Sequence, residues 1–295
     1  MEGKVEKIIT PKKFVLNGFV FGPKKAKNIF IYVHGLAGSL FSHLDLFEKI
    51  IDKNNAVLAF NNRGSGIITP IKRLCASRKK GYKTMSLGMV HEVFTDCVDD
   101  IEGAIMSAKS LGAKNIFLLG YSTGCQKSIY YLAKKQKTPV KGAILLAPMS
   151  DYAITAAWTD QKVLAKAVSC ARKMVREGQG QEFMPKNIWP DLITAQRFLS
   201  LNTADSVEEI FTYASNQPAK ILQRVKKPLL VILAGEDEYR DRPIKEIAAW
   251  FEKNIDNKKG QLKTIKNSLH GFRGHEAEVA RVIKKFTESA VFQFR

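Results

Sequence analysis

The segment Gly120-Tyr121-Ser122-Thr123-Gly124 carries a Gly-x-Ser-x-Gly pattern that can place a serine for nucleophilic attack. It follows the apolar run 116–119 and precedes residues 126–135, which are compatible with a helix. A serine in a tight strand-to-helix turn is held up at the end of a sheet, with its hydroxyl exposed. Glycine at both ends of the pattern leaves room for the turn and for close strand–helix packing. The pattern therefore predicts a nucleophile elbow with Ser122 as the nucleophile.

A neutral serine hydroxyl is a weak nucleophile, so it needs a base that takes its proton. His270 lies in the loop after the last predicted strand and is flanked by Gly271, and we choose it as the base. His275, at the start of the final predicted helix, is the less suitable alternative. His43 and His91 lie in or beside helices, far from strand ends, and are predicted to be structural.

The base in turn needs a carboxylate that orients it. The turn after the predicted strand 228–234 is rich in acids, and Asp237, two residues beyond Gly235, is the best placed of them. Glu238 is the second choice and Asp151, after an earlier strand, the third. Serine, acid and histidine thus follow one another in the order Ser122, Asp237, His270.

Ester and amide cleavage also needs backbone N–H groups aimed at the oxyanion that forms. One donor is predicted to be Thr123, directly after the nucleophile, and the other Leu36, in the Gly-containing loop 34–38 after an early buried strand. His34 begins that loop and is predicted mainly to hold it. We also include His34 and Tyr121 among the candidate substrate-binding residues.

Strands and helices alternate through most of the chain, which predicts an α/β fold with a mostly parallel sheet covered by helices on both faces. Strands are predicted at 5–10, 14–21, 28–33, 56–60, 116–119, 142–146, 228–234 and 261–266. Helices are predicted at 42–52, 92–111, 126–135, 244–253 and 276–289, and a polar, basic loop at 67–89.

The alternation stops between residues 152 and 227, where helices are predicted at 154–176, 192–201 and 207–214. We therefore predict a core domain made of 1–151 and 228–295, with a helical cap at 152–227. Long insertions in such sheets usually lie over the carboxyl ends of the strands, where ligands bind. Trp158 and Trp189 of the insertion are accordingly candidate substrate-binding residues.

The composition is that of a soluble globular protein, with 45% hydrophobic and 25% charged residues among 295. A net charge of +19 raises the question of nucleic acid, but the basic residues are spread along the chain without a recognisable binding motif. We therefore predict a solvated basic surface and no specific nucleic-acid partner. The sequence has no signal peptide pattern and no apolar run of membrane-span length, so we expect a cytoplasmic protein. We expect it to be a monomer or a homodimer.

The four cysteines are scattered and predicted to be reduced thiols. No cluster of ligand residues at metal-binding spacing and no Gly-rich nucleotide motif is present. We expect neither a metal nor another cofactor.

Taken with these residues, the chain resembles the α/β-hydrolase superfamily over essentially its full length. GYSTG matches the nucleophile segment, AGEDE the acid turn, LHGF the base loop and HGLAGS the oxyanion loop. The stretches FNNRG, EVFTDCVDDI, GYSTGCQKSIYY and AGEDEY are similar to the branch that includes fungal siderophore esterases. The tail of the acid turn, Arg240-Asp241-Arg242-Pro243, departs from the usual apolar ending, which leaves open whether Asp237 or Glu238 serves.

The resemblance implies a serine esterase that acts on a small-molecule ester. A serine at the elbow, in place of aspartate, favours an acyl-enzyme and hence esters, thioesters or amides. Two alternatives remain at this point: an acyltransferase or thioesterase on the same residues, and a non-catalytic binding protein that keeps the fold.

Overall fold

The computed structural model describes residues 2–215, 217–256 and 258–292, and within them ten strands form one sheet. The strands follow the order β10-β9-β8-β7-β3-β4-β2-β5-β6, and β1 pairs with β2. Their bounds are β1 Gly3–Ile9, β2 Phe14–Phe21, β3 Asn28–Val33, β4 Asn55–Phe60, β5 Thr69–Leu74, β6 Tyr82–Leu87, β7 Asn115–Tyr121, β8 Val140–Leu146, β9 Leu229–Ala234 and β10 Gly260–Ile265.

The strands from β10 through β4 run parallel, whereas β1, β2, β5 and β6 pair antiparallel. The strands β4 and β9, which have a neighbour on each side, are buried at every position, as expected for apolar runs covered on both faces. The predicted α/β fold with a mostly parallel sheet is confirmed.

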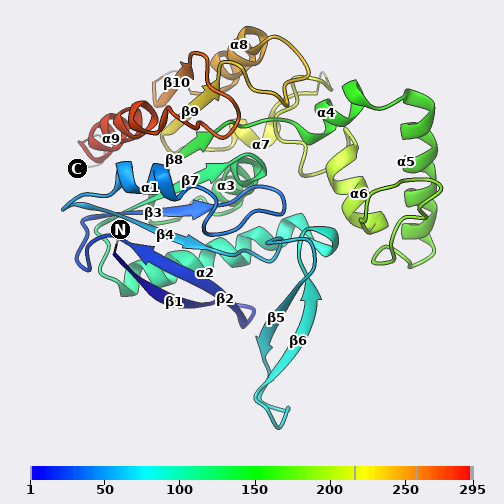
Figure 1. Cartoon of the computed structure of the whole chain (residues 1–295), viewed down its shortest axis with the longest axis horizontal. Helices are drawn as coiled ribbons and strands as arrows, with labels where there is room; N and C mark the ends of the chain where they lie inside the picture. The colour runs from blue at the N-terminus through cyan, green and yellow to red at the C-terminus, as the bar shows by residue number, and fades with distance from the viewer. Residues whose placement is uncertain (1, 216, 257, 293–295) are drawn as a thin grey trace.

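Helices cover both faces of this sheet (Figure 1). On one face α1 and α9 pack with Phe47, Ile283 and Phe286 in a common apolar cluster, and on the other α2, α3 and α8 pack with Ile101, Ile129 and Phe251. The bounds are α1 Leu44–Ile50, α2 Cys97–Ser110, α3 Thr123–Lys134, α8 Ile244–Asn254 and α9 Glu276–Phe292. The helix expected from residue 92 begins later, because residues 89–91 and 94–96 form short 3-10 turns.

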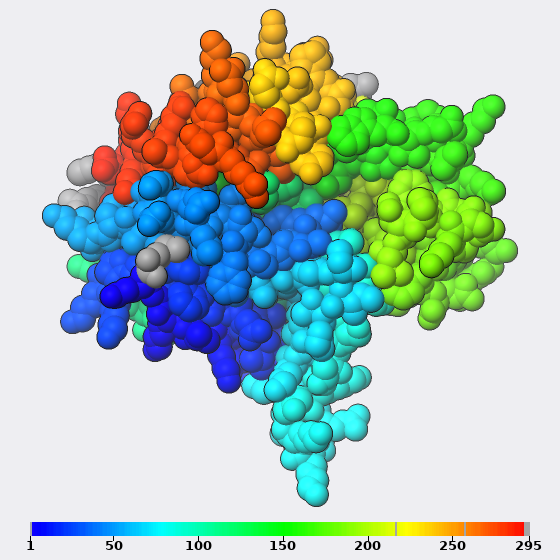
Figure 2. All heavy atoms as spheres, viewed as in Figure 1, coloured from blue at the N-terminus to red at the C-terminus, as the bar shows by residue number. Residues whose placement is uncertain are grey.

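The loop expected at 67–89 is wrong, because β5 and β6 form an antiparallel hairpin there. Figure 2 shows this hairpin, in cyan, projecting from the body of the protein. Ile71 is its only fully buried residue among the twelve positions of the two strands. The usual signal of a half-buried strand is therefore missing, because both faces of the hairpin meet solvent.

Between β8 and β9 lie α4 Asp151–Trp158, α5 Gln161–Arg176, α6 Ala195–Asn202 and α7 Lys220–Gln223. The single helix expected at 154–176 is two helices, because Asp160 accepts the N–H groups of Lys162 and Val163 and so begins α5. The helix expected at 207–214 is wrong, because those residues form turns and irregular backbone.

Residues of α5 and α6 form an apolar cluster separate from the two that flank the sheet, including Leu164, Ala171 and Phe198. The division of the chain into a core and a cap stays a prediction. Within the described ranges, no helix combines the length and the apolar character that crossing a membrane requires.

Candidate active site

Ser122 lies between the end of β7 and the start of α3, and its backbone has φ 52° and ψ −126°. A non-glycine residue with positive φ is strained and persists only where the surrounding structure holds it. The neighbouring backbone explains the two glycines. A Cβ at Gly124 would lie 1.9 Å from the carbonyl oxygen of Val33, and one at Gly120 would lie 2.6 Å from that of Gly124. The sequence pattern thus produces a sharp strand-to-helix turn with Ser122 at its apex.

The loop after β3 lies directly against this serine. A Cβ at Gly35 would come within 2.9 Å of the Cβ of Ser122, so only glycine allows this approach. The N–H of Leu36 donates to no acceptor among the described residues. The N–H of Thr123 belongs to the first turn of α3, where backbone donors have no partner inside the helix. Both predicted oxyanion donors therefore have a free N–H beside the nucleophile.

The His34 ring holds this loop in place through two hydrogen bonds. Its Nδ1–H donates to the carbonyl oxygen of Gly35 at 2.8 Å, and its Nε2 accepts the N–H of Asn62 at 3.1 Å. Burial lowers the pKa of His34 to about 4, which keeps the ring neutral and able to make both bonds. The ring is completely buried and does not line the cavity beside Ser122, so the structure does not bring it to the place of a substrate.

Asp237 and His270 are brought together by the turns after β9 and β10. Nδ1–H of His270 donates to Oδ2 of Asp237 at 2.7 Å, and the Asp237 side chain is inaccessible to solvent. The other oxygen of Asp237 accepts the N–H of Tyr239 at 3.0 Å. The rings of Tyr121 and Tyr239 lie 5.1 Å and 4.9 Å from that of His270. The imidazole is thus fixed in one orientation, with Nδ1 bonded to Asp237.

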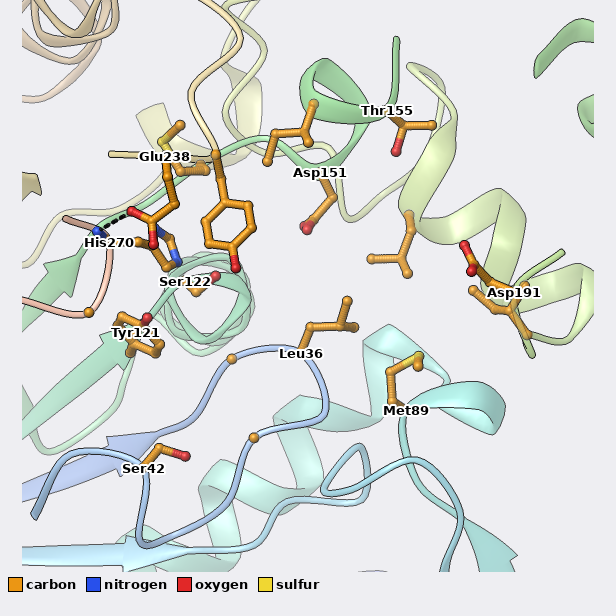
Figure 3. A pocket seen from close by; sticks show the side chains of 18 of the residues that line it. Leu36, Ser42, Met89, Tyr121, Ser122, Asp151, Thr155, Asp191, Glu238 and His270 are labelled. Atoms are coloured by element: carbon orange, nitrogen blue, oxygen red, sulfur yellow. Dashed lines mark hydrogen bonds between the residues drawn. The ribbon is translucent and has the colours of Figure 1, made fainter. Parts of the chain in front are cut away.

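The other candidate acids have different partners. Glu238 accepts the backbone N–H of His270 at 2.8 Å, the bond drawn in Figure 3, and so does not bind the ring. Asp241, in the unusual tail of the turn, pairs with Arg242 at 2.8 Å. Asp151 accepts Nε2–H of Gln126 at 3.0 Å. Of these carboxylates only Asp237 contacts the imidazole of His270.

Ser122 and His270 line one cavity of about 940 Å³ between the sheet and the segment 152–227 (Figure 3). Among the described contacts no hydrogen bond joins Oγ of Ser122 to the His270 ring. Such bonds are often long before substrate binds and tighten in the complex. The two residues therefore face a common space in which a reacting group can lie between them.

The cavity wall includes some predicted substrate-binding residues and omits others. Tyr121, Leu36 and Trp189 line it, whereas Trp158 is 59% exposed and lies outside it, with its ring 6.4 Å from that of Tyr239. Sequence reasoning missed several lining residues, which are Ile67, Met89, Met149, Ile154, Leu192 and Tyr239. Of these, only Tyr239 belongs to one of the stretches that resemble the esterase family, AGEDEY, so its position in that stretch is the one sequence signal that could have placed it near the site.

The remaining histidines have other partners. His43 packs edge-on against Tyr121, with ring centroids 4.1 Å apart, and burial lowers its pKa to about 4. His91 contacts Phe183, and His275 precedes α9. No group of three or more histidine, cysteine or acidic side chains in the described ranges is arranged to hold a metal ion. The four cysteines form no disulfide.

The strand order, the helices on both faces and the strand-to-helix turn at Ser122 define the α/β-hydrolase fold. Solved structures agree over nearly the whole chain. An esterase from Pyrococcus furiosus, Pf2001, matches with a TM-score of 0.61 and 16% identity over 98% of this chain and 91% of its own. A thermostable carboxyl esterase from Bacillus coagulans matches with a TM-score of 0.63 and 14% identity over 99% of both chains.

The chain belongs to a family described as "Protein of unknown function (DUF1749)", whose model matches residues 26–288. A curated relative, "Putative esterase/lipase 2" of Mycoplasma genitalium, is 30% identical over 132 residues, which cover 45% of this chain and 42% of the relative. The chain thus aligns with less than half of that relative's length. The narrower resemblance to fungal siderophore esterases stays a prediction.

Proposed function

We propose that this protein is a serine hydrolase that cleaves carboxylic esters through an acyl-enzyme on Ser122. The observation that carries the proposal is the shared cavity: Ser122 at a strained elbow and His270, bonded to the buried Asp237, line the same wall. The names of the relatives add support, since the Mycoplasma protein and both solved structures are described as esterases or esterase/lipases.

In this mechanism Oγ of Ser122 attacks the ester carbonyl while its proton passes to Nε2 of His270. Asp237 occupies Nδ1–H, so Nε2 is the nitrogen available to accept that proton. The N–H groups of Leu36 and Thr123 stabilise the negative oxygen that forms. His270 then returns the proton to the leaving alcohol, which leaves the acyl group on Ser122.

Water completes the cycle. His270 removes a proton from a water molecule that attacks the acyl carbonyl, and the collapse of the second oxyanion releases the acid and restores Oγ–H of Ser122. In both halves of this sequence the nucleophile that holds the acyl group, the base and the oxyanion donors come from the protein, and the ester and water are the reactants.

The test is Ser122→Ala against Ser42→Ala, because Ser42 is a second serine hydroxyl that lines the same cavity. We expect a fluorophosphonate probe to label the wild-type protein and Ser42→Ala but not Ser122→Ala. Hydrolysis of p-nitrophenyl butyrate should fall by at least about 10⁴-fold in kcat/KM only in Ser122→Ala. Labelling or turnover that does not depend on Ser122 would refute the proposal.

A further inference from the structure

The cavity beside Ser122 contains a carboxylate that the proposed mechanism does not use. Asp151 follows β8 as the first residue of α4, and Figure 3 shows its side chain directed into the cavity. Its role is not that of a helix cap, because Ser150 already accepts the N–H of Ala153 at the start of α4. The carboxylate therefore faces the cavity without serving as the cap of α4.

The side-chain amide of Gln126 holds the Asp151 carboxylate in place. Gln126, 2% exposed, donates from Nε2 to Oδ2 of Asp151 at 3.0 Å and to the carbonyl oxygen of Met149 at 2.8 Å. Both bonds come from one buried amide in α3, the helix that begins directly after Ser122. Asp151 is thus fixed relative to the proposed nucleophile.

The buried cations nearest to Asp151 are already paired with other carboxylates. Lys127 lies 2.5 Å from Glu92, and Arg197 binds both Glu92, at 2.8 Å, and Glu208. Two cations therefore balance two carboxylates, and neither forms an ion pair with Asp151. In the part of the chain that the structure describes, no lysine, arginine or histidine forms an ion pair with this carboxylate.

The other charged side chains of the cavity wall also include more carboxylates than cations. Asp191 and Glu238 add two carboxylates, and Arg273 is the one arginine or lysine among the described lining residues. Arg273 is exposed, so solvent screens much of its charge. The cavity is therefore anionic in a protein whose net charge is +19.

The Asp151 side chain is partly exposed to the cavity. A carboxylate that is partly removed from water and has no cation bound to it is destabilised, and its protonation or the arrival of a cation relieves the penalty. Burial, together with the charge of Glu208, raises the pKa of Asp151 to about 7, although the charges of Arg197 and Lys127 act in the opposite direction. A ligand cation seated against Asp151 would supply the charge that the surrounding side chains do not.

We propose that the cavity selects esters that carry a cationic group, an ammonium in the first instance, and that Asp151 binds this group. The inference rests on the proposed esterase function and names its substrate class. Asp151 binds the cation as a charged hydrogen-bond acceptor, whereas Ser122 and His270 act on the ester carbonyl. Neutral esters of the same shape would leave the carboxylate unpaired.

The first experiment compares matched pairs of esters in which an ammonium replaces an uncharged group of similar size. Aminohexanoyl and heptanoyl p-nitrophenyl esters, with shorter homologues, test the acyl side. Dimethylaminoethyl acetate, whose protonated nitrogen carries one N–H donor, and 3-methylbutyl acetate, its uncharged analogue of the same shape, test the alcohol side. At about pH 8, where the Asp151 carboxylate is charged, we expect at least one cationic ester to exceed its neutral partner in kcat/KM by roughly 10- to 100-fold.

The second experiment repeats the best pair with Asp151→Asn and with Asp191→Asn. The readout is the ratio of the two kcat/KM values, which a general loss of activity does not change. Asp191 also lines the cavity but is exposed, so its variant removes the same charge from the rim. The preference should vanish in Asp151→Asn and change by less than about twofold in Asp191→Asn.

Two outcomes would overturn the subsite: Ser122-dependent turnover with no cationic ester preferred, or a preference that survives in Asp151→Asn. Binding of hexylammonium and of hexanol to the catalytically silent Ser122→Ala protein gives a readout that needs no activity. We expect hexylammonium to bind and hexanol not to bind, and we expect Asp151→Asn to weaken the binding of hexylammonium. If the wild type is neither labelled nor hydrolyses esters, the esterase proposal fails, but this binding comparison still decides the subsite. The subsite is refuted if hexylammonium does not bind, or if it binds equally well with and without the Asp151→Asn change.

Discussion

Oδ2 of Asp237 lies 2.7 Å from Nδ1 of His270, while the next residue, Glu238, accepts the backbone N–H of the same histidine at 2.8 Å. Two adjacent carboxylates thus bind one residue in different ways. Asp237 orients the ring, and Glu238 holds the loop that carries it.

This division of roles predicts unequal effects of two conservative changes. Asp237→Asn presents an amide to Nδ1 and favours the wrong tautomer, so kcat should fall by about 10⁴-fold. Glu238→Gln keeps an oxygen that can accept the backbone N–H, so kcat should fall by less than about tenfold. Steady-state kinetics on p-nitrophenyl butyrate measure both. Equal losses in the two variants would contradict the assignment.

A second prediction concerns the space around the elbow. In Gly124→Ala the new methyl would lie 1.9 Å from the carbonyl oxygen of Val33, so the backbone of α3 must move away from β3. The free energy of unfolding should fall by at least about 1–3 kcal/mol, and activity should be lost. Chemical denaturation and ester turnover measure the two effects.

Gly271→Ala is the matched control for this change. Gly271 adjoins His270, but a Cβ there would meet no atom within 4 Å. Its unfolding free energy should stay within about 0.5 kcal/mol of the wild type. If Gly124→Ala were as stable as Gly271→Ala, the packing argument for the elbow would be wrong.

A third prediction concerns the buried ion pairs beneath the cavity. Lys127 is completely buried and pairs with Glu92, which also binds Arg197 of α6. Lys127→Met leaves Glu92 with one cation in place of two, so the unfolding free energy should fall by about 3–5 kcal/mol. Lys173→Met, which breaks an exposed pair with Glu177, should change it by less than about 0.5 kcal/mol. A comparable effect of the two changes would show that burial of the Glu92 pair is unimportant.

Reasoning from sequence identified the elbow and the pair Asp237–His270 because each leaves a local signal. A glycine-flanked serine after an apolar run, and an acid or histidine just after a predicted strand, can be read within a few residues. The parallel sheet then brings these strand ends to one edge.

The parts that sequence reasoning missed depend on contacts between distant residues. Glu92, Lys127 and Arg197 form one buried network, yet Lys127 lies in α3, Arg197 in α6 and Glu92 between two short 3-10 turns. None of the three lies in an apolar pattern. Trp158 and Trp189 looked equivalent in sequence, but only Trp189 faces the cavity. The hairpin β5–β6 was missed because few of its side chains are buried, so it lacks the alternation that predicts a strand.

The fourth prediction concerns the dependence of stability on pH. Burial raises the pKa of Asp151 to about 7 and that of Glu209 to about 8, whereas both titrate near 4 in the unfolded chain. Between these values the folded state holds more protons than the unfolded state, so stability falls as pH rises. The groups that act on Asp151 are the charges of Glu208, Arg197 and Lys127, and those that act on Glu209 are Ser150, Asp151, Glu208 and Asp241.

Asp151→Asn removes one of these titrations and leaves the others in place. The melting temperature of the variant, relative to the wild type, should therefore rise as pH increases from about 4 to about 7 and then level off. Thermal unfolding of both proteins across this range gives the difference directly, and the titration of Glu209, present in both, largely cancels. A difference that does not change with pH, or that falls as pH rises, would mean that the Asp151 carboxyl keeps its ordinary pKa in the folded protein. That result would also remove one support for a cation site at the cavity wall.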